Sequence, residues 1–442
     1  MLNIVIPEEP NWIINRLISS GYEACVVGGC VRDSILGKAP KDWDICTNAS
    51  PQAVKKVFSD NKIVDTGLKH GTITIILDKD SYEVTTYRID GKYSDGRHPD
   101  DVEFTNSLKE DLSRRDFTIN AMAYNDNVGL IDYFGGEPDL ANGIIKCVGN
   151  PNDRFNEDAL RILRAIRFAS VLGFNVEAST SNSIFGNYKL LSAVSSERIS
   201  SEFSKWICGD FSAQTLREYQ DIVCYIIPEI SSMIGFQQNN PYHDYDVWEH
   251  TLHALENSRS ELNVRLAVLF HDIGKPKSYG CVDGIGHFYG HALYSKEIVE
   301  EVLKRMKFDN KTIDNVSLLV YNHDVEITDT SRSVKKVLNK VGCLFENLME
   351  VKYADTLGQS KVAIDEKLKT FDSIRMIYQT IMEQNSCFRL RDLAITGKDL
   401  LLAGYSEGKQ IGNILNSLLE LVIDGTVKND RQELLDVVKG LK

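Results

Sequence analysis

Two glycines followed by two aspartates are the residues whose types and spacing most directly indicate chemistry. Gly28 and Gly29 follow the apolar run 24–27, and Asp42 and Asp44 come next after a short polar segment. Glycines let backbone N–H groups approach a phosphate, and the start of a helix favours negative charge. Aspartates at i and i+2 on a strand place both carboxylates on one face, where they can bind Mg²⁺. The segment therefore predicts metal-dependent chemistry on a nucleotide phosphate.

Further charged residues could complete such a site. Glu83 lies in an expected strand over 82–87 and could be a third carboxylate for two metal ions. Arg114 and Arg115 could bind triphosphate oxygens, and Asp116 could bind a ribose hydroxyl. Each residue also has a plainer interpretation, because a strand glutamate is often simply exposed and an aspartate in a first helical turn favours the helix dipole.

A charged helix face follows. The sequence predicts one helix through Glu157, Asp158 and Arg161, which places the three side chains on one face. A carboxylate and a guanidinium fixed side by side could hydrogen-bond the edge of a base, and the alternative is an ordinary salt bridge within the helix. Arg161, Arg164 and Arg167 recur every three residues, which predicts a local basic track.

A second group of candidate ligands lies further along the chain. Seven of the nine histidines fall between His243 and His323, in sequence with a helical pattern. Histidine and aspartate side chains bind divalent transition metals, and a metal could activate water for attack on a phosphate ester. Isolated histidines are more often structural, but this spacing favours a metal centre. The candidate residues are His250, His271, Asp272, His287, His291, His323 and Asp324.

The elements that must position these residues follow from the apolar periodicity. Alternating strands and helices predict an α/β domain over 22–148, and the chain from about 153 onward has a helical pattern. A polar stretch at 88–104 predicts a long flexible loop. Expected strands lie at 24–27, 43–47, 72–77, 82–87 and 143–148, and expected helices include 51–60 and 107–123.

Composition excludes several classes of protein. The 442 residues exceed one core and predict several domains, while 43% hydrophobic and 26% charged residues are typical of a folded soluble chain. No apolar run is long enough for a membrane span, and the N-terminus lacks the features of a signal peptide. The nine cysteines form no CxxC pair, which favours a reducing cytoplasm. A net charge of −13 argues against nucleic-acid binding, although a local basic surface can exist in an acidic protein.

The motifs GGCVRD…DWD, EVTTYR, RRDFTINAMA, DYFGG, NEDALRILRAIRFA and SSERIS occur in order over residues 20–210. They resemble those of class II tRNA nucleotidyltransferases, the family of CCA-adding enzymes and bacterial poly(A) polymerases. The resemblance implies Mg²⁺ ligands at Asp42, Asp44 and Glu83, and base selection by Asp158 and Arg161. The remaining nucleotide-binding residues that it implies are Gly28, Gly29, Arg32, Arg114, Arg115, Asp116, Asn120, Arg164 and Arg198.

The segment HDIGK resembles the HD superfamily of phosphohydrolases. This resemblance implies His250, His271, Asp272 and Asp324 as ligands of a divalent ion such as Ni²⁺, Mn²⁺, Co²⁺ or Mg²⁺. His287 and His291 could support a second ion or the substrate phosphate. The last part of the chain is similar to the C-terminal region of bacterial CCA-adding enzymes, but Glu407-Gly408 stands where the family often has Pro-Gly.

Together these features predict a polymerase beta-like α/β nucleotidyltransferase head followed by an all-helical neck, body and tail, with the HD domain in the body. The expected boundaries are 1–140, 141–210, 211–330 and 331–442. The expected activity is addition of CCA to tRNA 3′ ends from CTP and ATP in the cytoplasm, with no membrane partner. The alternatives are an A-adding enzyme, a poly(A) polymerase, an HD phosphohydrolase with an RNA-binding head, or a non-catalytic RNA-binding scaffold. The resemblance makes a CC-adding enzyme the least favoured alternative, because CC-adding members of the family have a shortened flexible loop, whereas the 88–104 segment has full length.

Overall fold

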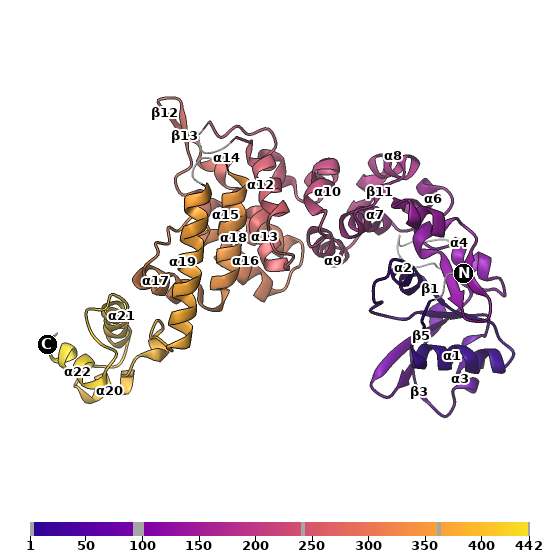
Figure 1. The fold of residues 1–442 in the computed structure, drawn as a ribbon, viewed down its shortest axis with the longest axis horizontal. Helices are drawn as coiled ribbons and strands as arrows, with labels where there is room; N and C mark the ends of the chain where they lie inside the picture. Colours follow the sequence, from indigo (N-terminus) through magenta and orange to yellow (C-terminus); the bar gives the residue numbers. More distant parts are fainter. Residues whose placement is uncertain (1–3, 92–100, 240–243, 360–363, 441–442) are drawn as a thin grey trace. The chain divides into compact units, whose positions relative to one another are not determined.

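The computed structural model describes residues 4–91, 101–239, 244–359 and 364–440. Its chain divides into two compact units, Met1–Ile226 and Ile227–Lys442 (Figure 1). The division falls inside the range expected for the body, because α10 (Ser212–Glu218) packs on α7 (Leu160–Leu172) and α9 (Ser196–Ile207) of the first unit. The four-part division at residues 140, 210 and 330 stays a prediction.

A seven-stranded sheet forms the centre of the first unit, in the order β3-β4-β5-β2-β1-β8-β9. The pair β2–β5 is parallel, and the other neighbours are antiparallel. All four residues of β1 are buried, as expected for an apolar strand at the middle of a sheet. The strands are β1 (Ala24–Val27), β2 (Ile45–Thr47), β3 (Lys62–Gly67), β4 (Thr72–Leu77), β5 (Asp80–Thr86), β8 (Met122–Asn125) and β9 (Gly129–Asp132).

Short helices and 3₁₀ turns connect these strands. Ser50 caps α3, because its hydroxyl accepts a hydrogen bond from the N–H of Ala53 and Pro51 occupies the first helical position. The connecting helices are α1 (Glu8–Ser19), α2 (Gly29–Ile35), α3 (Pro51–Val57), α4 (Leu108–Ser113) and α5 (Gly136–Ala141), and the 3₁₀ turns are Leu68–His70 and Thr118–Asn120.

The helix predicted over 107–123 is wrong in its second half. Helix α4 ends at Ser113, and the buried residues of β8 pair instead with both β1 and β9. An apolar run such as Met122–Asn125 satisfies either a helix or a central strand, and the two neighbouring strands decide the outcome. The strand predicted over 143–148 is also shorter. Only β10 (Ile144–Ile145) forms, and it pairs in parallel with β11 (Asn175–Val176) outside the main sheet.

The segment 88–104 is not a loop throughout. Strand β6 (Arg88–Asp90) pairs antiparallel with β7 (Val102–Phe104), so the ends of the segment form a hairpin. Residues 92–100 lie outside the described part of the chain. The strand predicted over 43–47 begins only at Ile45, so Asp42 and Asp44 occupy the extended approach to β2 rather than the strand itself.

Helices complete the first unit. Helix α7 buries Ile162, Leu163 and Ile166 and ends at Gly173, whose φ of +72° is the left-handed conformation of a helix end. The predicted helix through Glu157–Arg161 is broken, because Asp158 adopts an extended backbone between α6 and α7. The helices are α6 (Pro151–Glu157), α7 (Leu160–Leu172), α8 (Ala178–Asn187), α9 (Ser196–Ile207), α10 and α11 (Gln220–Ile226), and a 3₁₀ turn spans Tyr188–Ala193.

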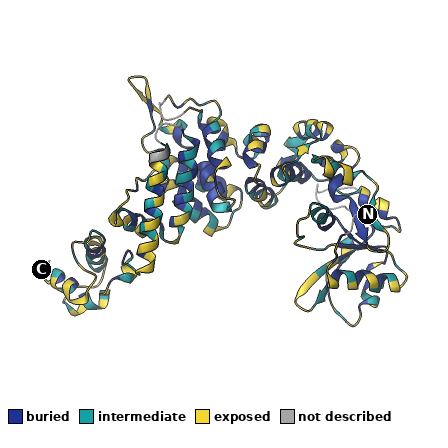
Figure 2. Ribbon diagram, viewed as in Figure 1, coloured by how far each residue is buried: buried dark blue, intermediate teal, exposed yellow. Residues whose placement is uncertain are grey.

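The second unit is almost entirely helical. Helices α12, α13, α15, α16 and α18 pack on one another, and the buried residues gather inside this bundle (Figure 2). Its helices are α12 (Val247–Glu256), α13 (Leu262–Phe270), α14 (Lys275–Ser278), α15 (His291–Arg305), α16 (Asn310–Asn322), α17 (Ser331–Val341), α18 (Phe345–Gly358) and α19 (Ile364–Glu383). A hairpin of β12 (Gly280–Val282) and β13 (Ile285–His287) and 3₁₀ turns at Pro228–Ser232, Gly342–Leu344 and Leu390–Asp392 complete it.

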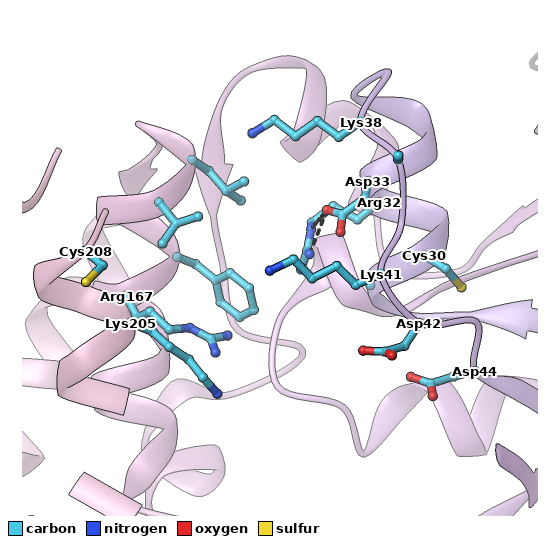
Figure 3. A pocket seen from close by; sticks show the side chains of 15 residues that line it. Cys30, Arg32, Asp33, Lys38, Lys41, Asp42, Asp44, Arg167, Lys205 and Cys208 are labelled. Carbon is cyan, nitrogen blue, oxygen red and sulfur yellow. Dashed lines mark hydrogen bonds and ion pairs between the residues drawn. The ribbon is translucent and has the colours of Figure 1, made fainter. Parts of the chain in front are cut away.

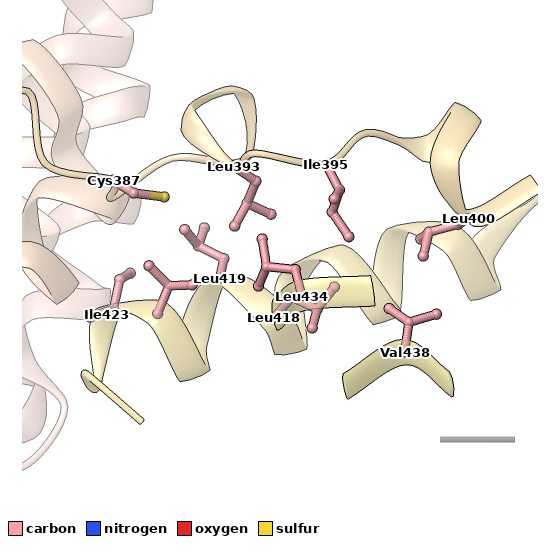
Figure 4. Packing of buried hydrophobic residues seen from close by; sticks show 10 residues of the cluster. Cys387, Leu393, Ile395, Leu400, Leu418, Leu419, Ile423, Leu434 and Val438 are labelled. Atoms are coloured by element: carbon pink, nitrogen blue, oxygen red, sulfur yellow. The ribbon is translucent and has the colours of Figure 1, made fainter. Parts of the chain in front are cut away.

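The last helices have a core of their own. Helices α20 (Gly397–Leu402), α21 (Lys409–Ile423) and α22 (Arg431–Gly440) contribute Leu400, Leu418, Leu434 and Val438 to a buried cluster (Figure 4). Within the described residues, no helix combines the length and apolar character that a membrane span requires.

Candidate active site and candidate metal centre

Three carboxylates meet at one edge of the head sheet. Ile45 on β2 is paired with Val84 on β5, so the residues just before them, Asp44 and Glu83, are neighbours. Figure 3 shows the carboxylates of Asp42 and Asp44 side by side. Partial burial, followed by the charges of Asp44 and Asp42, raises the pKa of Glu83. Three acids that repel one another in this way are suited to bind divalent cations, which would neutralise them.

The positive charge of Arg115 acts on this group of carboxylates. Partial burial raises the pKa of Asp44, the charge of Arg115 lowers it, and the charge of Asp42 raises it again. Gly28, at the turn from β1 into α2, has a φ of +83°, and a Cβ there would lie 3.1 Å from Arg115 Nη1. Glycine is therefore needed at position 28 both for the left-handed backbone and for the close approach of the guanidinium.

A hydrogen-bonded network links several of the predicted nucleotide-binding residues. Arg32 Nη1 donates to Asn120 Oδ1 at 2.6 Å, and Asn120 Nδ2 donates to Asp116 Oδ1 at 3.1 Å. Arg164 Nε donates to the other oxygen of Asp116 at 2.9 Å. Burial alone would raise the pKa of Asp116, but the charge of Arg164 and these hydrogen bonds hold it well below its usual range. Asp116 is therefore ionised, and its hydrogen bonds hold the side chains of Asn120 and Arg164 in place.

Arg114 and Arg161 are also engaged within the protein. Arg114 Nη2 binds Asp111 Oδ1 at 2.8 Å, and its Nη1 lies 3.5 Å from Asp90 Oδ2. Arg161 is buried, and its guanidinium pairs with Glu157 and donates to the backbone carbonyl of Arg114 at 3.0 Å. These contacts join the start of α7 to the loop that carries the two adjacent arginines.

Asp158 and Arg161 lie on either side of a helix start. Asp158 Oδ1 accepts from the N–H of Leu160 at 3.0 Å, and its Oδ2 accepts from Arg198 Nη2 at 2.8 Å. Arg198, one of the predicted nucleotide-binding residues, therefore fixes the carboxylate of Asp158. Because the chain breaks between α6 and α7, each of the two side chains predicted to select the base is held by different partners.

The predicted basic track of Arg161, Arg164 and Arg167 is not a free cationic surface. The three guanidinium groups pair with Glu157, Asp116 and Glu202, respectively. The periodicity correctly placed these arginines near one another along α7, but their acidic partners lie on α6, in the segment before η2 (Thr118–Asn120) and on α9. Those partners could not be read from the helix alone.

A cavity of about 620 Å³ opens beside the carboxylates (Figure 3). Asp42 and Asp44 line one side, and the cationic side chains of Lys38, Lys41 and Lys205 face the same space. Arg32, Gly29, Arg167 and Phe168 also line it. The sequence reasoning missed the three lysines. Lys38 and Lys41 lie between the two opening motifs and could have been noticed, whereas Lys205 reaches the cavity only because α9 packs on α7.

A second cluster lies inside the helical bundle of the other unit. His250 comes from α12, His271 follows α13, His291 begins α15, and His323 follows α16. Each Nδ1 lies 2.6 to 3.0 Å from a backbone carbonyl, which can only accept, so each Nδ1 carries the hydrogen. Each Nε2 therefore faces the interior of the cluster and is the ring atom that can bind a metal ion there.

The ring nitrogens meet in two pairs. His250 Nε2 lies 3.3 Å from His271 Nε2, and His291 Nε2 lies 3.1 Å from His323 Nε2. Two ring nitrogens at these distances need either a proton or a metal ion between them. Asp272 lies between the pairs, because its Oδ2 is 3.2 Å from His271 Nε2 and its Oδ1 is 3.4 Å from His291 Nε2. The donors fit two metal ions that share one carboxylate.

Acidic and basic neighbours complete the cluster. Asp355 on α18 places Oδ1 3.0 Å from His250 Nε2, a position predicted for Asp324. Burial alone would raise the pKa of Asp272, but the charges of His271 and Lys275 hold it well below its usual range. Lys275 Nζ lies 2.6 Å from Asp272 Oδ2 and lines a pocket of about 300 Å³ next to the cluster.

Two predicted ligands lie away from the ligand groups. Asp324 is exposed and lines this pocket, but it belongs to neither group of candidate metal ligands found among the described residues. His287 ends strand β13, and its ring stacks on Tyr289 with centroids 5.4 Å apart. The position of Asp355, 31 residues beyond Asp324 on another helix, had no recognisable motif in the sequence.

Comparisons with known proteins match nearly the whole chain. The model of the poly(A) polymerase head domain matches residues 24–146, and one described as tRNA nucleotidyltransferase domain 2 matches residues 288–438. A third, described as "Probable RNA and SrmB- binding site of polymerase A", matches residues 173–233. His250, His271 and Asp272 lie between the matched ranges.

Whole-chain relatives carry one name. The CCA-adding enzymes of Ligilactobacillus salivarius and Pediococcus pentosaceus are each 34% identical, over 97% and 98% of this chain and 95% and 98% of their own lengths. The crystal structure of the Bacillus stearothermophilus CCA-adding enzyme in complex with CTP superimposes with a TM-score of 0.70 at 28% identity, covering 99% of both chains. The chain therefore belongs to the CCA-adding enzymes, a family of tRNA nucleotidyltransferases.

Proposed function

We propose that the first unit adds CCA to the 3′ ends of tRNA from CTP and ATP. In each step the terminal tRNA hydroxyl oxygen bonds to the α-phosphorus of the nucleotide, its proton is lost, and pyrophosphate leaves. The three adjacent carboxylates of Asp42, Asp44 and Glu83, beside a cavity with cationic walls, carry this proposal. Names of whole-chain relatives and the CTP complex of a relative support it.

Mg²⁺ fits the three carboxylates, whose mutual repulsion it would relieve. When bound, it would lower the pKa of the attacking hydroxyl and stabilise charge on the leaving group. Asp42, Asp44 and Glu83 would hold it, while Lys38 and Lys41 would bind the triphosphate from the cavity wall.

Base selection is assigned to Asp158 and Arg161. A carboxylate that accepts and a guanidinium that donates can together match the edges of cytosine and adenine. The ion pair with Arg198 and the contact with the Arg114 carbonyl hold the two groups in fixed orientations. Rigid partners of this kind let protein side chains discriminate among nucleotides without a nucleic-acid template.

Substitution of Glu83 tests the carboxylate site. Glu83→Gln should abolish CTP incorporation into tRNA that lacks its terminal CCA, because one ligand is lost. In metal-free buffer the same variant should unfold at a higher temperature than wild type, because it removes repulsion from Asp42 and Asp44. Asp80→Asn at the exposed start of the same strand is the control and should change neither result. Full incorporation by Glu83→Gln would contradict the assignment.

The cytoplasm is the proposed compartment. None of the nine cysteines, all of which lie in the described part of the chain, forms a disulfide bond, and a reducing environment maintains that state.

A second function, metal-dependent hydrolysis of a phosphate ester, is proposed for the histidine cluster. Four imidazoles held by carbonyl hydrogen bonds with their Nε2 atoms directed inward are the observation that favours it. Bound Ni²⁺, Mn²⁺, Co²⁺ or Mg²⁺ would activate water and stabilise charge on the phosphate. Lys275 is placed at the adjoining pocket, where its ammonium group could bind a phosphate oxygen.

Two aspartates separate the geometric assignment from the one based on sequence. Asp355→Asn should weaken metal binding by at least about tenfold, the loss typical even of outer-shell partners. Asp324→Asn should leave the metal affinity close to wild type, because Asp324 is exposed. Metal content after dialysis and hydrolysis of a phosphate monoester or cyclic phosphate are the measurements. If Asp324→Asn loses metal and Asp355→Asn does not, the ligand assignment is wrong.

A further inference from the structure

Phe168 on α7 occupies the point at which the arginines beside the nucleotide cavity meet. Its side chain lines the cavity but is only 6% exposed, and its ring makes an edge-to-face contact with Phe117 at 5.7 Å between centroids. A ring so deeply covered offers little free surface for stacking on a nucleobase. Any role of Phe168 in the site must therefore depend on its contacts with other side chains of the protein.

Three guanidinium groups surround this one ring. The Cζ atoms of Arg167, Arg32 and Arg164 lie 4.2, 5.0 and 5.6 Å from its centroid. These distances are within the range of cation–π interactions. The three arginines come from two helices, because Arg32 belongs to α2 and the others belong to α7.

Each guanidinium also has an acid or amide partner that constrains it. Arg32 binds Asp33 and Asn120, Arg164 binds Asp116, and Arg167 binds Glu202. The partners fix one edge of each guanidinium group, whereas the ring of Phe168 constrains the plane of that guanidinium group. Three cations at this spacing also repel one another, and the electron-rich face of an aromatic ring offsets part of that repulsion.

We propose that Phe168 is a positioning residue that holds these guanidinium groups in the orientation required to bind the incoming nucleotide. The inference rests on the proposed nucleotidyl transfer in the first unit. Phe168 acts through the arginines and does not itself contact the reacting atoms. A leucine at this position would fill much of the same core space but would remove the aromatic face.

The test compares Phe168→Leu with Phe203→Leu. Phe203 is a fully buried aromatic residue on α9, which packs on α7, and its ring contacts Trp206. Both variants lose a buried aromatic ring, so both should lower the unfolding temperature. Only Phe168→Leu should raise the KM for CTP and ATP, by about tenfold if one to two cation–π contacts are lost, with kcat changed less. Phe168→Tyr retains the aromatic face and should stay close to wild type.

Discrimination is the second readout. Phe168→Leu should incorporate UTP and GTP relative to CTP more readily than Phe203→Leu, because loosely held guanidinium groups select less strictly. An unchanged KM and discrimination in Phe168→Leu would overturn the proposal, and so would equal changes in the two leucine variants or a Phe168→Tyr variant as impaired as Phe168→Leu. Calorimetric CTP affinity, measured without tRNA, tests Phe168 even if the wild-type protein fails to extend tRNA.

Discussion

Asp116 shows how a residue predicted to contact substrate is also engaged with the residues around it. Its two oxygens accept from Asn120 and Arg164, and Asn120 in turn accepts from Arg32. The motif RRDFTINAMA identified Asp116 and Asn120 as members of one site, and the structure joins them. The sequence could not show that the carboxylate is saturated by protein donors, because Arg164 lies 48 residues further along the chain.

Asp116→Asn should destabilise the first unit at neutral pH by about 1–3 kcal/mol, because the half-buried guanidinium of Arg164 loses its charged partner. The pKa of Asp116 is lower in the folded than in the unfolded protein, where it is near the ordinary value of 3.8. Its contribution is therefore fully present above that value and is lost as the pH falls below it. The difference between wild type and variant should narrow below about pH 4.

Urea denaturation followed by tryptophan fluorescence measures this effect, since Trp12, Trp43 and Trp206 all belong to the first unit. Asp139→Asn is the control, because the hydrogen bond to Asp139 comes from the neutral hydroxyl of Thr118. A destabilisation of Asp116→Asn that stays constant from pH 7 to pH 3 would show that the ion pair is not its cause.

At the scale of secondary-structure elements, the turn between β1 and α2 determines the position of the sheet edge that carries the three carboxylates. Gly28 begins the turn, and its N–H donates to the carbonyl of Met122 on β8 at 3.1 Å. The absence of a side chain leaves room for Arg115, whose charge acts on Asp44. One turn thereby fixes the nucleotide cavity relative to the carboxylates.

Gly28→Ala should lower the free energy of unfolding by more than the left-handed backbone strain alone would. The strained backbone accounts for about 1–2 kcal/mol, and displacement of Arg115 adds to it and should impair nucleotide incorporation. Gly129→Ala is a matched control, because Gly129 has the same φ of +83° but a Cβ there would meet no atom of the described residues within 4 Å. Thermal unfolding and CTP incorporation check both variants. Equal losses of activity in the two would mean that the approach of Arg115 is unimportant.

The sequence predicted an element best where its residue pattern was compatible with only one type of secondary structure. Strand β1 was expected because its short apolar run ends in two glycines, and helix α3 was expected from the helical pattern over 51–60. The expected helix 107–123 failed because β8 is a strand only in the company of β1 and β9. The break at Asp158 was hidden, since the residue that ends α6 also accepts a hydrogen bond from the N–H of Leu160 at the start of α7. Local periodicity does not contain these non-local pairings.

The same limit applies to the two sites. Motifs spaced closely along the chain identified the carboxylates of the head and three of the four histidines that the cluster unites, together with Asp272. His323 was noted only as part of the cluster, and Asp355 was missed because it lies alone on α18, where nothing nearby marks it as a ligand. Residues recruited singly from distant helices need the packing of the bundle to be recognised.

At the scale of the whole molecule, the two candidate sites belong to separate compact units. The carboxylates and the nucleotide cavity lie in the first, and the four inward-directed histidines lie in the second. The net charge of −13 does not exclude an RNA substrate, because Lys38, Lys41 and Lys205 provide local positive charge at the cavity.

This separation predicts independent activities. Asp272→Ala should eliminate metal binding and phosphoester hydrolysis in the second unit while CTP and ATP incorporation continue near the wild-type rate. Asp44→Asn should do the reverse. The two assays on the same preparations, with circular dichroism to confirm folding, check this. If Asp272→Ala also halts incorporation while remaining folded, the two sites are functionally coupled.

The central claim, CCA addition, is tested most directly by incubating the purified protein with three tRNA substrates. The first lacks all three terminal nucleotides, the second lacks only the terminal A, and the third is complete. Each is given single nucleotides in separate reactions and CTP plus ATP together. Gel analysis should show two C residues and one A added to the first, one A added to the second, and no extension of the third, all lost in Asp42→Ala/Asp44→Ala. Long A tracts, or A addition without C addition, would identify a different polymerase and contradict CCA addition.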